Sequence, residues 1–140
     1  MTTYRRYADI AIGEVFPPAP TRFEVTDAIV DAFLAATGDA SVHYLPQARS
    51  ARLAPPALAA VYVVEALKAR GGRPGGVHAK QQFIFHREPT VGDVLFTQGR
   101  VSDKYERKGR NYIVSETRTT DAAGNLVTTG ITTGIWGSEE

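Results

Sequence analysis

Hydrophobic positions recur with a helical period in the first half of the chain and with a period of two in the second half. Between residues 27 and 37 the large apolar side chains are Ile29, Val30, Phe33 and Leu34. This spacing places them on one face of a helix. Thr26 is a suitable N-cap because its hydroxyl can accept a hydrogen bond from a free backbone N–H, and Gly38 ends the pattern. The sequence therefore predicts an amphipathic helix over 27–37.

A second helix is predicted over residues 57–70, and it is apolar on nearly every face as far as Glu65. Pro55-Pro56 precedes it, where a missing N–H costs nothing because the first amides of a helix have no partner within it. Gly71-Gly72 follows and ends it. A helix that is apolar all round is typical of a buried element, so we expect this helix at the centre of the fold.

The remaining elements are predicted as strands. Within residues 8–26, Pro17-Pro18-Ala19-Pro20 interrupts the pattern before a short strand at 22–25. Four further strands are predicted at 77–87, 93–103, 110–121 and 126–136. The charged segment Asp103–Gly109 predicts a turn, and Gly124-Asn125 predicts a hairpin. We expect these four strands to form an antiparallel meander.

Together these elements predict an α+β architecture of two layers, in which an antiparallel sheet curls around the apolar helix. The length of 140 residues fits a single domain, 1–140. A sheet that wraps one helix leaves edges and apolar surface at its ends, so we expect two subunits to pair.

Composition narrows the classes of function. The net charge of +1 favours neither nucleic acid nor an anionic membrane as a partner. The absence of cysteine excludes disulfides and thiolate metal ligands, and three dispersed histidines predict no metal site. The N-terminus lacks the apolar core of a signal peptide, and the longest nearly apolar run, 53–64, is too short to span a bilayer. We therefore expect a cytoplasmic protein.

The residues best suited to acid–base chemistry follow the first predicted helix. Asp39 and His43 lie four positions apart on a turn-rich loop. A carboxylate can orient an imidazole and tune its pKa, which makes this pair well suited to moving protons near neutral pH. The other interpretation of Asp39 is a loop residue that stabilises the helix end through its own backbone.

Three segments carry a likeness to a known family. The first is Ala36-Thr37-Gly38-Asp39 with a histidine soon after it, and the second is Ala54-Pro55-Pro56 before the central helix. The third is Arg87-Glu88-Pro89-Thr90-Val91-Gly92-Asp93, which is followed by a strand and then by residues 103–110. Together they resemble the MaoC-like branch of the hotdog-fold superfamily over roughly residues 10–136. This branch includes (R)-specific enoyl-thioester hydratases and 3-hydroxyacyl dehydratases. The fold expected from the resemblance is a hotdog: an antiparallel sheet wrapped around one central helix.

The resemblance implies that Asp39 and His43 hold a water molecule against the double bond of an acyl thioester and transfer the proton for hydration or its reversal. Ser41 stands at the position of the family's asparagine. The start of the central helix, around Pro56 and Ala57, would stabilise the thioester oxygen, with the Ala57 amide as donor. The acyl carrier would be coenzyme A or an acyl carrier protein, and the chemistry implies no cofactor.

Two departures from the family pattern favour a second interpretation. Four positions rather than the usual five separate Asp39 from His43, and Pro55-Pro56 stands where hydratases have His-Gly. Proline has no N–H to donate. The second interpretation is a non-catalytic hotdog subunit that binds an acyl thioester or pairs with a catalytic partner, so that a homodimer and a heterodimer both remain open. A third is a hotdog thioesterase, which needs a carboxylate on the central helix, where Glu65 stands late.

Other polar side chains also have two interpretations each. Tyr62 in the central helix and Tyr44 beside His43 would either line an acyl pocket or satisfy their hydroxyls at the edge of the core. A set of basic residues would either contact the phosphates of the acyl carrier or lie on solvated turns. That set is Arg49, Arg52, Arg70, Arg73, Lys104, Arg107, Lys108 and Arg110.

Overall fold

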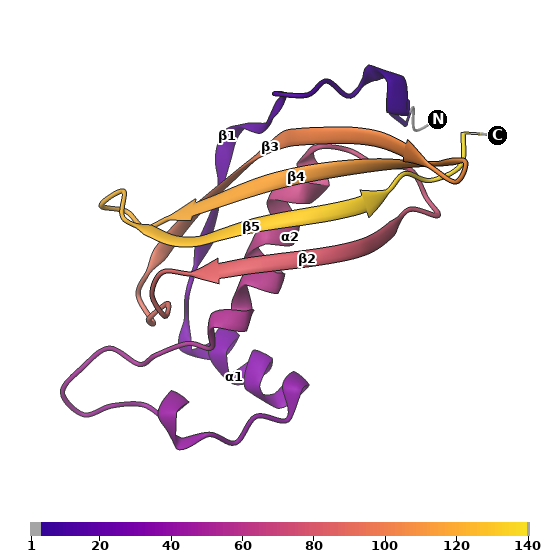
Figure 1. The fold of residues 1–140 in the computed structure, drawn as a ribbon. Helices are drawn as coiled ribbons and strands as arrows, with labels where there is room; N and C mark the ends of the chain where they lie inside the picture. The colour runs from indigo at the N-terminus through magenta and orange to yellow at the C-terminus, as the bar shows by residue number, and fades with distance from the viewer. Residues whose placement is uncertain (1–3, 140) are drawn as a thin grey trace.

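The computed structural model describes residues 4–139 and consists of one antiparallel sheet with a helix lying across one of its faces (Figure 1). The strands are β1 (Val15–Glu24), β2 (Val77–Phe85), β3 (Val94–Arg107), β4 (Arg110–Thr120) and β5 (Leu126–Ile135). The helices are α1 (Asp27–Thr37) and α2 (Ala59–Ala69), and three single turns of 3₁₀ helix lie at Tyr7–Asp9, Val42–Tyr44 and Pro56–Leu58. The α+β prediction of a sheet around one central helix is confirmed.

The order of strands in the sheet is β1-β3-β4-β5-β2, which corrects the predicted meander. The strands β3, β4 and β5 are neighbours because only two residues separate β3 from β4 and only five separate β4 from β5. The strand β2 instead pairs with β5, with Ile84 opposite Thr129. The connection 86–93 therefore crosses from one side of the sheet to the other, and this crossing positions the site described below.

Two breaks that the sequence predicts between strands are wrong, because the strands continue through them. The proline segment at 17–20 lies inside β1, where the pairing with β3 shifts between Phe16 and Thr21. An edge strand tolerates proline because one row of its N–H groups is unpaired. The segment predicted as a turn from Asp103 belongs mostly to β3, where Tyr105 stacks on Tyr112 at 4.8 Å between ring centroids. The turn itself is Lys108-Gly109, both with positive φ, as a two-residue hairpin turn requires.

The ends of α1 agree with their sequence signals. The Thr26 hydroxyl accepts a hydrogen bond from the Ile29 amide at 3.2 Å, and Gly38 closes the helix with a left-handed φ of 66°. Such a C-terminal residue favours glycine because a β-carbon would crowd the carbonyl in that conformation.

The central helix α2 is buried on one side only. Ala59, Tyr62, Val63 and Ala66 are buried, whereas Val61 is 43% exposed and Ala60 beside it is exposed too. The prediction of burial on every face is therefore wrong for this single chain. Its residues 4–139 cover only the sheet-facing side, so an apolar stripe of α2 remains in solvent.

The core has two parts along α2. One gathers around Leu58, Tyr62 and Leu95 near the beginning of the helix, and the other contains Phe16 and Trp136 near its end. Gly99 makes the second part possible, since a β-carbon there would lie 2.5 Å from the Phe16 ring. No helix within 4–139 is long and apolar enough to cross a membrane.

Candidate functional site

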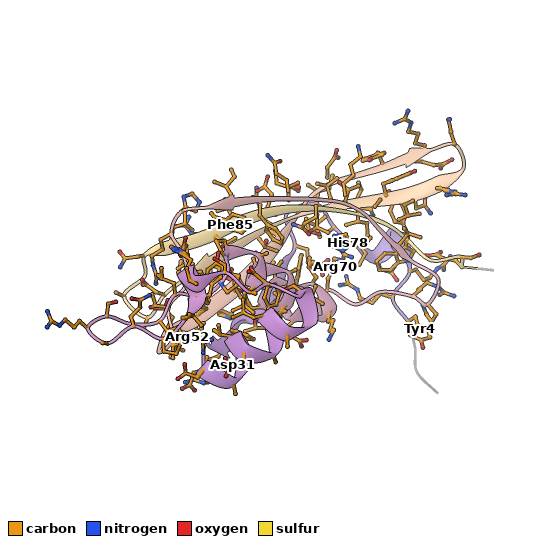
Figure 2. The ribbon with its side chains drawn as sticks, turned by 90° about the horizontal axis from the view of Figure 1, so that it is seen from below. Tyr4, Asp31, Arg52, Arg70, His78 and Phe85 are labelled. Atoms are coloured by element: carbon orange, nitrogen blue, oxygen red, sulfur yellow. The ribbon has the colours of Figure 1, made fainter. Side chains whose placement is uncertain are left out.

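The loop that carries the predicted catalytic residues is anchored by Arg52. The Arg52 side chain is 7% exposed, and its guanidinium pairs with Asp27 at 3.0 Å and with Asp31 at 2.8 Å, both on α1. Its Nε donates to the Tyr44 carbonyl at 2.8 Å. Figure 2 labels Arg52 and Asp31 at the end of the molecule that carries this loop. Arg52 thus holds loop 38–52 against α1, and its guanidinium is engaged by these two carboxylates.

The end of this loop is joined to the connection between β2 and β3. The Ala54 amide donates to the Pro89 carbonyl at 2.7 Å, and the Val91 amide donates to the Arg52 carbonyl at 2.8 Å. These backbone hydrogen bonds place the two segments side by side at the start of α2. The residues on either side of Pro89 therefore face loop 38–52.

This arrangement brings His43 against Glu88. The His43 Nε2 lies 2.9 Å from one Glu88 carboxylate oxygen and 3.1 Å from the other. The imidazole is 52% exposed and the carboxylate 35% exposed. The Ser41 hydroxyl accepts a hydrogen bond from the His43 amide at 3.3 Å, and the Tyr44 ring packs edge-on against the imidazole. His43 is therefore an accessible imidazole whose Nε2 is held by a carboxylate.

Asp39 has a different partner. Its carboxylate accepts a hydrogen bond from the Ser41 amide at 2.9 Å, which is an Asx-type turn, and its side chain is exposed. No hydrogen bond or ion pair joins Asp39 to His43 in the described part of the chain. The structure thus places both residues on one exposed loop, while the carboxylate that contacts the imidazole comes from Glu88.

Glu88 itself is held by its neighbour Arg87. The Arg87 guanidinium donates to the Glu88 carbonyl at 3.0 Å and to the carboxylates of Asp93 and Asp121. Hydrogen bonding to Asp93 raises the pKa of Arg87. Burial works against ionisation of Asp93, but the hydrogen bonds from Arg87 and Thr90 outweigh it and lower the pKa of that carboxyl. These charges fix the backbone that carries Glu88.

Few backbone N–H groups at the beginning of the central helix are free to donate a hydrogen bond. Pro55 and Pro56 have no N–H, and the Leu58 amide donates to the Pro55 carbonyl at 2.9 Å. The Ala57 amide donates to no acceptor within 4–139. The start of the helix therefore offers one free amide, at Ala57, three residues after Ala54, which pairs with Pro89 next to Glu88.

Two other candidates have structural partners. Tyr62 is fully buried, and its hydroxyl lies 2.7 Å from that of Thr128. Burial raises the pKa of Tyr62. Glu65 pairs with Lys68 on the exposed side of α2, away from the sheet. In residues 4–139 no group of three or more His, Asp or Glu side chains is placed to hold a metal ion.

Glu88 stands within one of the family-like segments, but the sequence does not connect it with the histidine. The two residues are 45 positions apart, and the backbone contacts of Ala54 and Val91 bring them together. No periodicity or local spacing reports such a contact.

The comparisons with known proteins agree with this fold. A family model described as the FAS1-like dehydratase domain region matches residues 10–130. No curated protein matches the chain. Among solved structures, the unliganded R-hydratase PhaJ1 from Pseudomonas aeruginosa is 22% identical with a TM-score of 0.78, and the match covers 95% of this chain and 86% of that one.

Two further structures are similar. The C-terminally truncated HadBC (3R-hydroxyacyl-ACP dehydratase) complex from Mycobacterium tuberculosis is 21% identical with a TM-score of 0.76, over 89% of this chain and 96% of that one. An (R)-hydratase from A. caviae involved in PHA biosynthesis is 21% identical with a TM-score of 0.73, over 90% and 96%. At such identities these structures show the fold. Because the family model spans most of the chain, this protein belongs to the FAS1-like dehydratase-domain family and has the hotdog fold of the similar structures.

Proposed function

We propose that this chain is one hotdog half of a hydratase or dehydratase that acts on enoyl or 3-hydroxyacyl thioesters. The observation that carries the proposal is the His43–Glu88 pair, whose Glu88 is followed by Pro89, the residue that pairs with Ala54 three positions before the free Ala57 amide. An imidazole oriented by a carboxylate supplies acid–base chemistry, and a helix N-terminus supplies a donor for a developing negative charge. Membership of a dehydratase-domain family supports this class of reaction.

Hydration needs a base toward water and an acid toward the α-carbon. In the proposed step, the imidazole nitrogen that does not face Glu88 takes a proton from water as the water oxygen bonds to the β-carbon. The negative charge that develops on the thioester oxygen is stabilised by the Ala57 amide. The proton is then delivered to the α-carbon, and dehydration is the reverse. Asp39, on the same loop, serves as the second carboxylate toward water or the α-proton, and Ser41 and Tyr44 border the entrance.

A second hotdog domain completes the site in this proposal. The edge of β2 that faces away from β5 has no strand partner within 4–139, and Val77, Ile84 and Phe85 on it are each at least 45% exposed. The solvent side of α2 adds Val61 and the neighbouring Ala60. An unpaired edge beside exposed apolar side chains is typical of an interface. A second copy or another hotdog protein would bury this surface.

The second candidate is a non-catalytic half that holds the acyl thioester while a partner performs the chemistry. The observation that favours it is the exposure of His43 in the single chain, together with the missing amide of Pro56. Both candidates use the same interface, and they differ in whether His43 moves a proton.

A hydration assay separates the two candidates. The purified chain is mixed with short enoyl-CoA thioesters, and loss of the conjugated double bond is followed by absorbance. We expect hydration by wild type, and losses of about a hundredfold or more in kcat/KM for Asp39→Asn and His43→Gln. Glu65→Gln is the matched control, since that exposed carboxylate lies on the far side of α2 and should leave the rate unchanged. No turnover at any chain length, with activity restored by a second hotdog protein even when His43 is replaced, would establish the non-catalytic half.

A further inference from the structure

The C-terminal end of α2 contains an arginine whose charge is not balanced by its surroundings. Arg70 follows the last residue of α2, and its guanidinium lies 5.9 Å from the centroid of the Phe16 ring and 6.0 Å from that of Trp136. Its Nη1 donates to the Ser115 hydroxyl at 2.7 Å. The guanidinium therefore lies against β4 at Ser115, and Figure 2 labels Arg70 close to His78.

No carboxylate within residues 4–139 pairs directly with Arg70. The carboxylate that acts on it from a distance is Glu14, and both oxygens of Glu14 are held by Arg5. Two buried N–H groups in the described part of the chain also lack an acceptor: Arg70 Nε and the indole Nε1 of Trp136. Burial lowers the pKa of Arg70, which reflects the cost of keeping this cation away from water. A partly buried cation without a direct counter-charge is stabilised by an anion bound next to it.

A cavity of about 360 Å³ opens at this position, and we refer to it as the α2 C-terminal pocket. Besides Arg70 it is lined by the cationic or titratable side chains Lys68, Arg73 and His78, and no Asp or Glu among the described residues lines it. Lys68 is paired with Glu65, whereas the Arg73 Nε donates to the neutral Ser138 carbonyl at 2.9 Å. The excess of positive charge in the pocket favours an anion.

Glycine leaves the pocket open. Gly71, Gly72 and Gly76 contribute backbone to its wall, and Gly134 faces Arg70 from β5. A β-carbon on Gly134 would lie 3.8 Å from Arg70 Nη2, so the missing side chain keeps the approach to this amino group clear. A compact anion can therefore reach the guanidinium from the cavity side.

We propose that the α2 C-terminal pocket is a phosphate-binding site with Arg70 as its central contact. A phosphate group fits better than a single carboxylate, since it offers more acceptor oxygens and more charge to the cationic side chains that line the pocket. The pocket lies at the other end of α2 from the His43–Glu88 pair, and an eleven-residue helix is about 16 Å long. It is a second site, separate from the proposed chemistry.

The phosphate has two conceivable sources. It belongs either to the coenzyme A or phosphopantetheine part of an acyl thioester, which rests on the proposed function, or to a free phosphorylated small molecule. Both sources present the same phosphate group to the pocket. The test therefore measures the binding of phosphate itself and does not use enzymatic activity.

Trp136 provides the readout, because it is the only tryptophan of the chain and it lines the pocket. The single indole N–H resonance of ¹⁵N-labelled protein is followed while inorganic phosphate replaces chloride at constant ionic strength. We expect a saturable shift in wild type and at least tenfold weaker binding in Arg70→Gln. The matched control is Arg118→Gln, an exposed arginine on β4 outside the pocket, which should bind as wild type does.

A second variant keeps the test valid if Arg70→Gln does not fold. Arg73→Gln changes a side chain on the wall of the pocket that is not deeply buried, and it should weaken phosphate binding several-fold without changing the dispersion of the spectrum. A shift that does not saturate, or equal binding by wild type, Arg70→Gln and Arg73→Gln, would overturn the proposal.

Coenzyme A and pantetheine, which lacks phosphate, identify the source. If coenzyme A displaces phosphate and pantetheine does not, the site holds the phosphate of the acyl carrier. If phosphate binds and coenzyme A does not compete, the site serves a free phosphorylated ligand. Either result supports the pocket, and neither depends on whether the chain hydrates an enoyl thioester.

Discussion

The imidazole of His43 lies 2.9 Å from the carboxylate of Glu88, a residue 45 positions later in the chain. Asp39, only four positions away from the histidine, instead accepts a hydrogen bond from the Ser41 amide. The side chain that orients the imidazole is thus contributed by the connection between β2 and β3. This relationship changes which substitution reports most directly on the proposed chemistry.

We expect Glu88→Gln to lower kcat for enoyl-thioester hydration by about tenfold with little change in KM, because a neutral amide orients the imidazole but no longer stabilises its charged form. His43→Gln should cost about 10²- to 10⁴-fold. Steady-state kinetics on folded variants, with Glu65→Gln as the control, provide the measurement. Wild-type kcat in Glu88→Gln combined with an inactive Asp39→Asn would assign the orienting role to Asp39.

The ion pairs of Arg52 predict that replacing the arginine and replacing its two aspartate partners lower the free energy of unfolding by different amounts. Arg52→Met leaves Asp27 and Asp31 in water, where each side chain is more than 60% exposed, so we expect a loss of about 1–2 kcal/mol. Replacing both aspartates by alanine leaves a buried guanidinium without a counter-charge and should cost about 3 kcal/mol or more. Urea denaturation of both variants tests this order, and the reverse order would show that Arg52 is not buried in solution.

Replacing Gly99 by a larger residue is predicted to lower the free energy of unfolding for steric reasons. A β-carbon at this position would lie 2.5 Å from two atoms of the Phe16 ring, so Gly99→Ala should lower the free energy of unfolding by about 1–3 kcal/mol. Gly72→Ala is the matched control, since a β-carbon there would meet no neighbouring atom within 4 Å and the φ of Gly72 is not positive. Equal stability of the two variants in urea would contradict the packing of Phe16 under the sheet.

Tyr62→Phe separates a structural from a substrate-binding role for this residue. The change leaves the buried Thr128 hydroxyl without its partner at 2.7 Å, and we expect a loss of about 1–2 kcal/mol in stability. Because Tyr62 is fully buried, KM for the thioester should stay unchanged. A severalfold rise in KM with unchanged stability would instead place its hydroxyl in the acyl pocket.

Asp93 is expected to contribute to acid sensitivity. Its pKa in the folded protein is lowered below the usual value of 3.8, since hydrogen bonds from Arg87 and Thr90 outweigh the opposing effect of burial. The stabilisation is therefore complete above about pH 4 and is lost as the pH falls through the lowered pKa of the folded state. Asp93→Asn should be less stable than wild type at neutral pH and should lose less stability as the pH falls from about 5 to about 2.5. Urea unfolding across this range provides the measurement, and parallel profiles would exclude the linkage.

Local signals along the chain were sufficient for most elements. Thr26 and Gly38 bound α1 as predicted, because capping depends on hydrogen bonds between neighbours in sequence. The apolar run after Pro56 predicted the central helix for a similar reason. The prolines of β1 misled the prediction, since their effect depends on whether the strand lies at an edge.

The sequence by itself determined the helices, most of the strands and the family to which the chain belongs, since these rest on local periodicity and short motifs. Tertiary structure decided that β2 pairs with β5 and that Glu88 meets His43. It also decided that Arg70 lies beneath the sheet without a direct counter-charge from the described residues. Contacts of this kind depend on where the connection 86–93 crosses the sheet and on which side of α2 is covered. Neither feature is encoded by the spacing of residues along the chain.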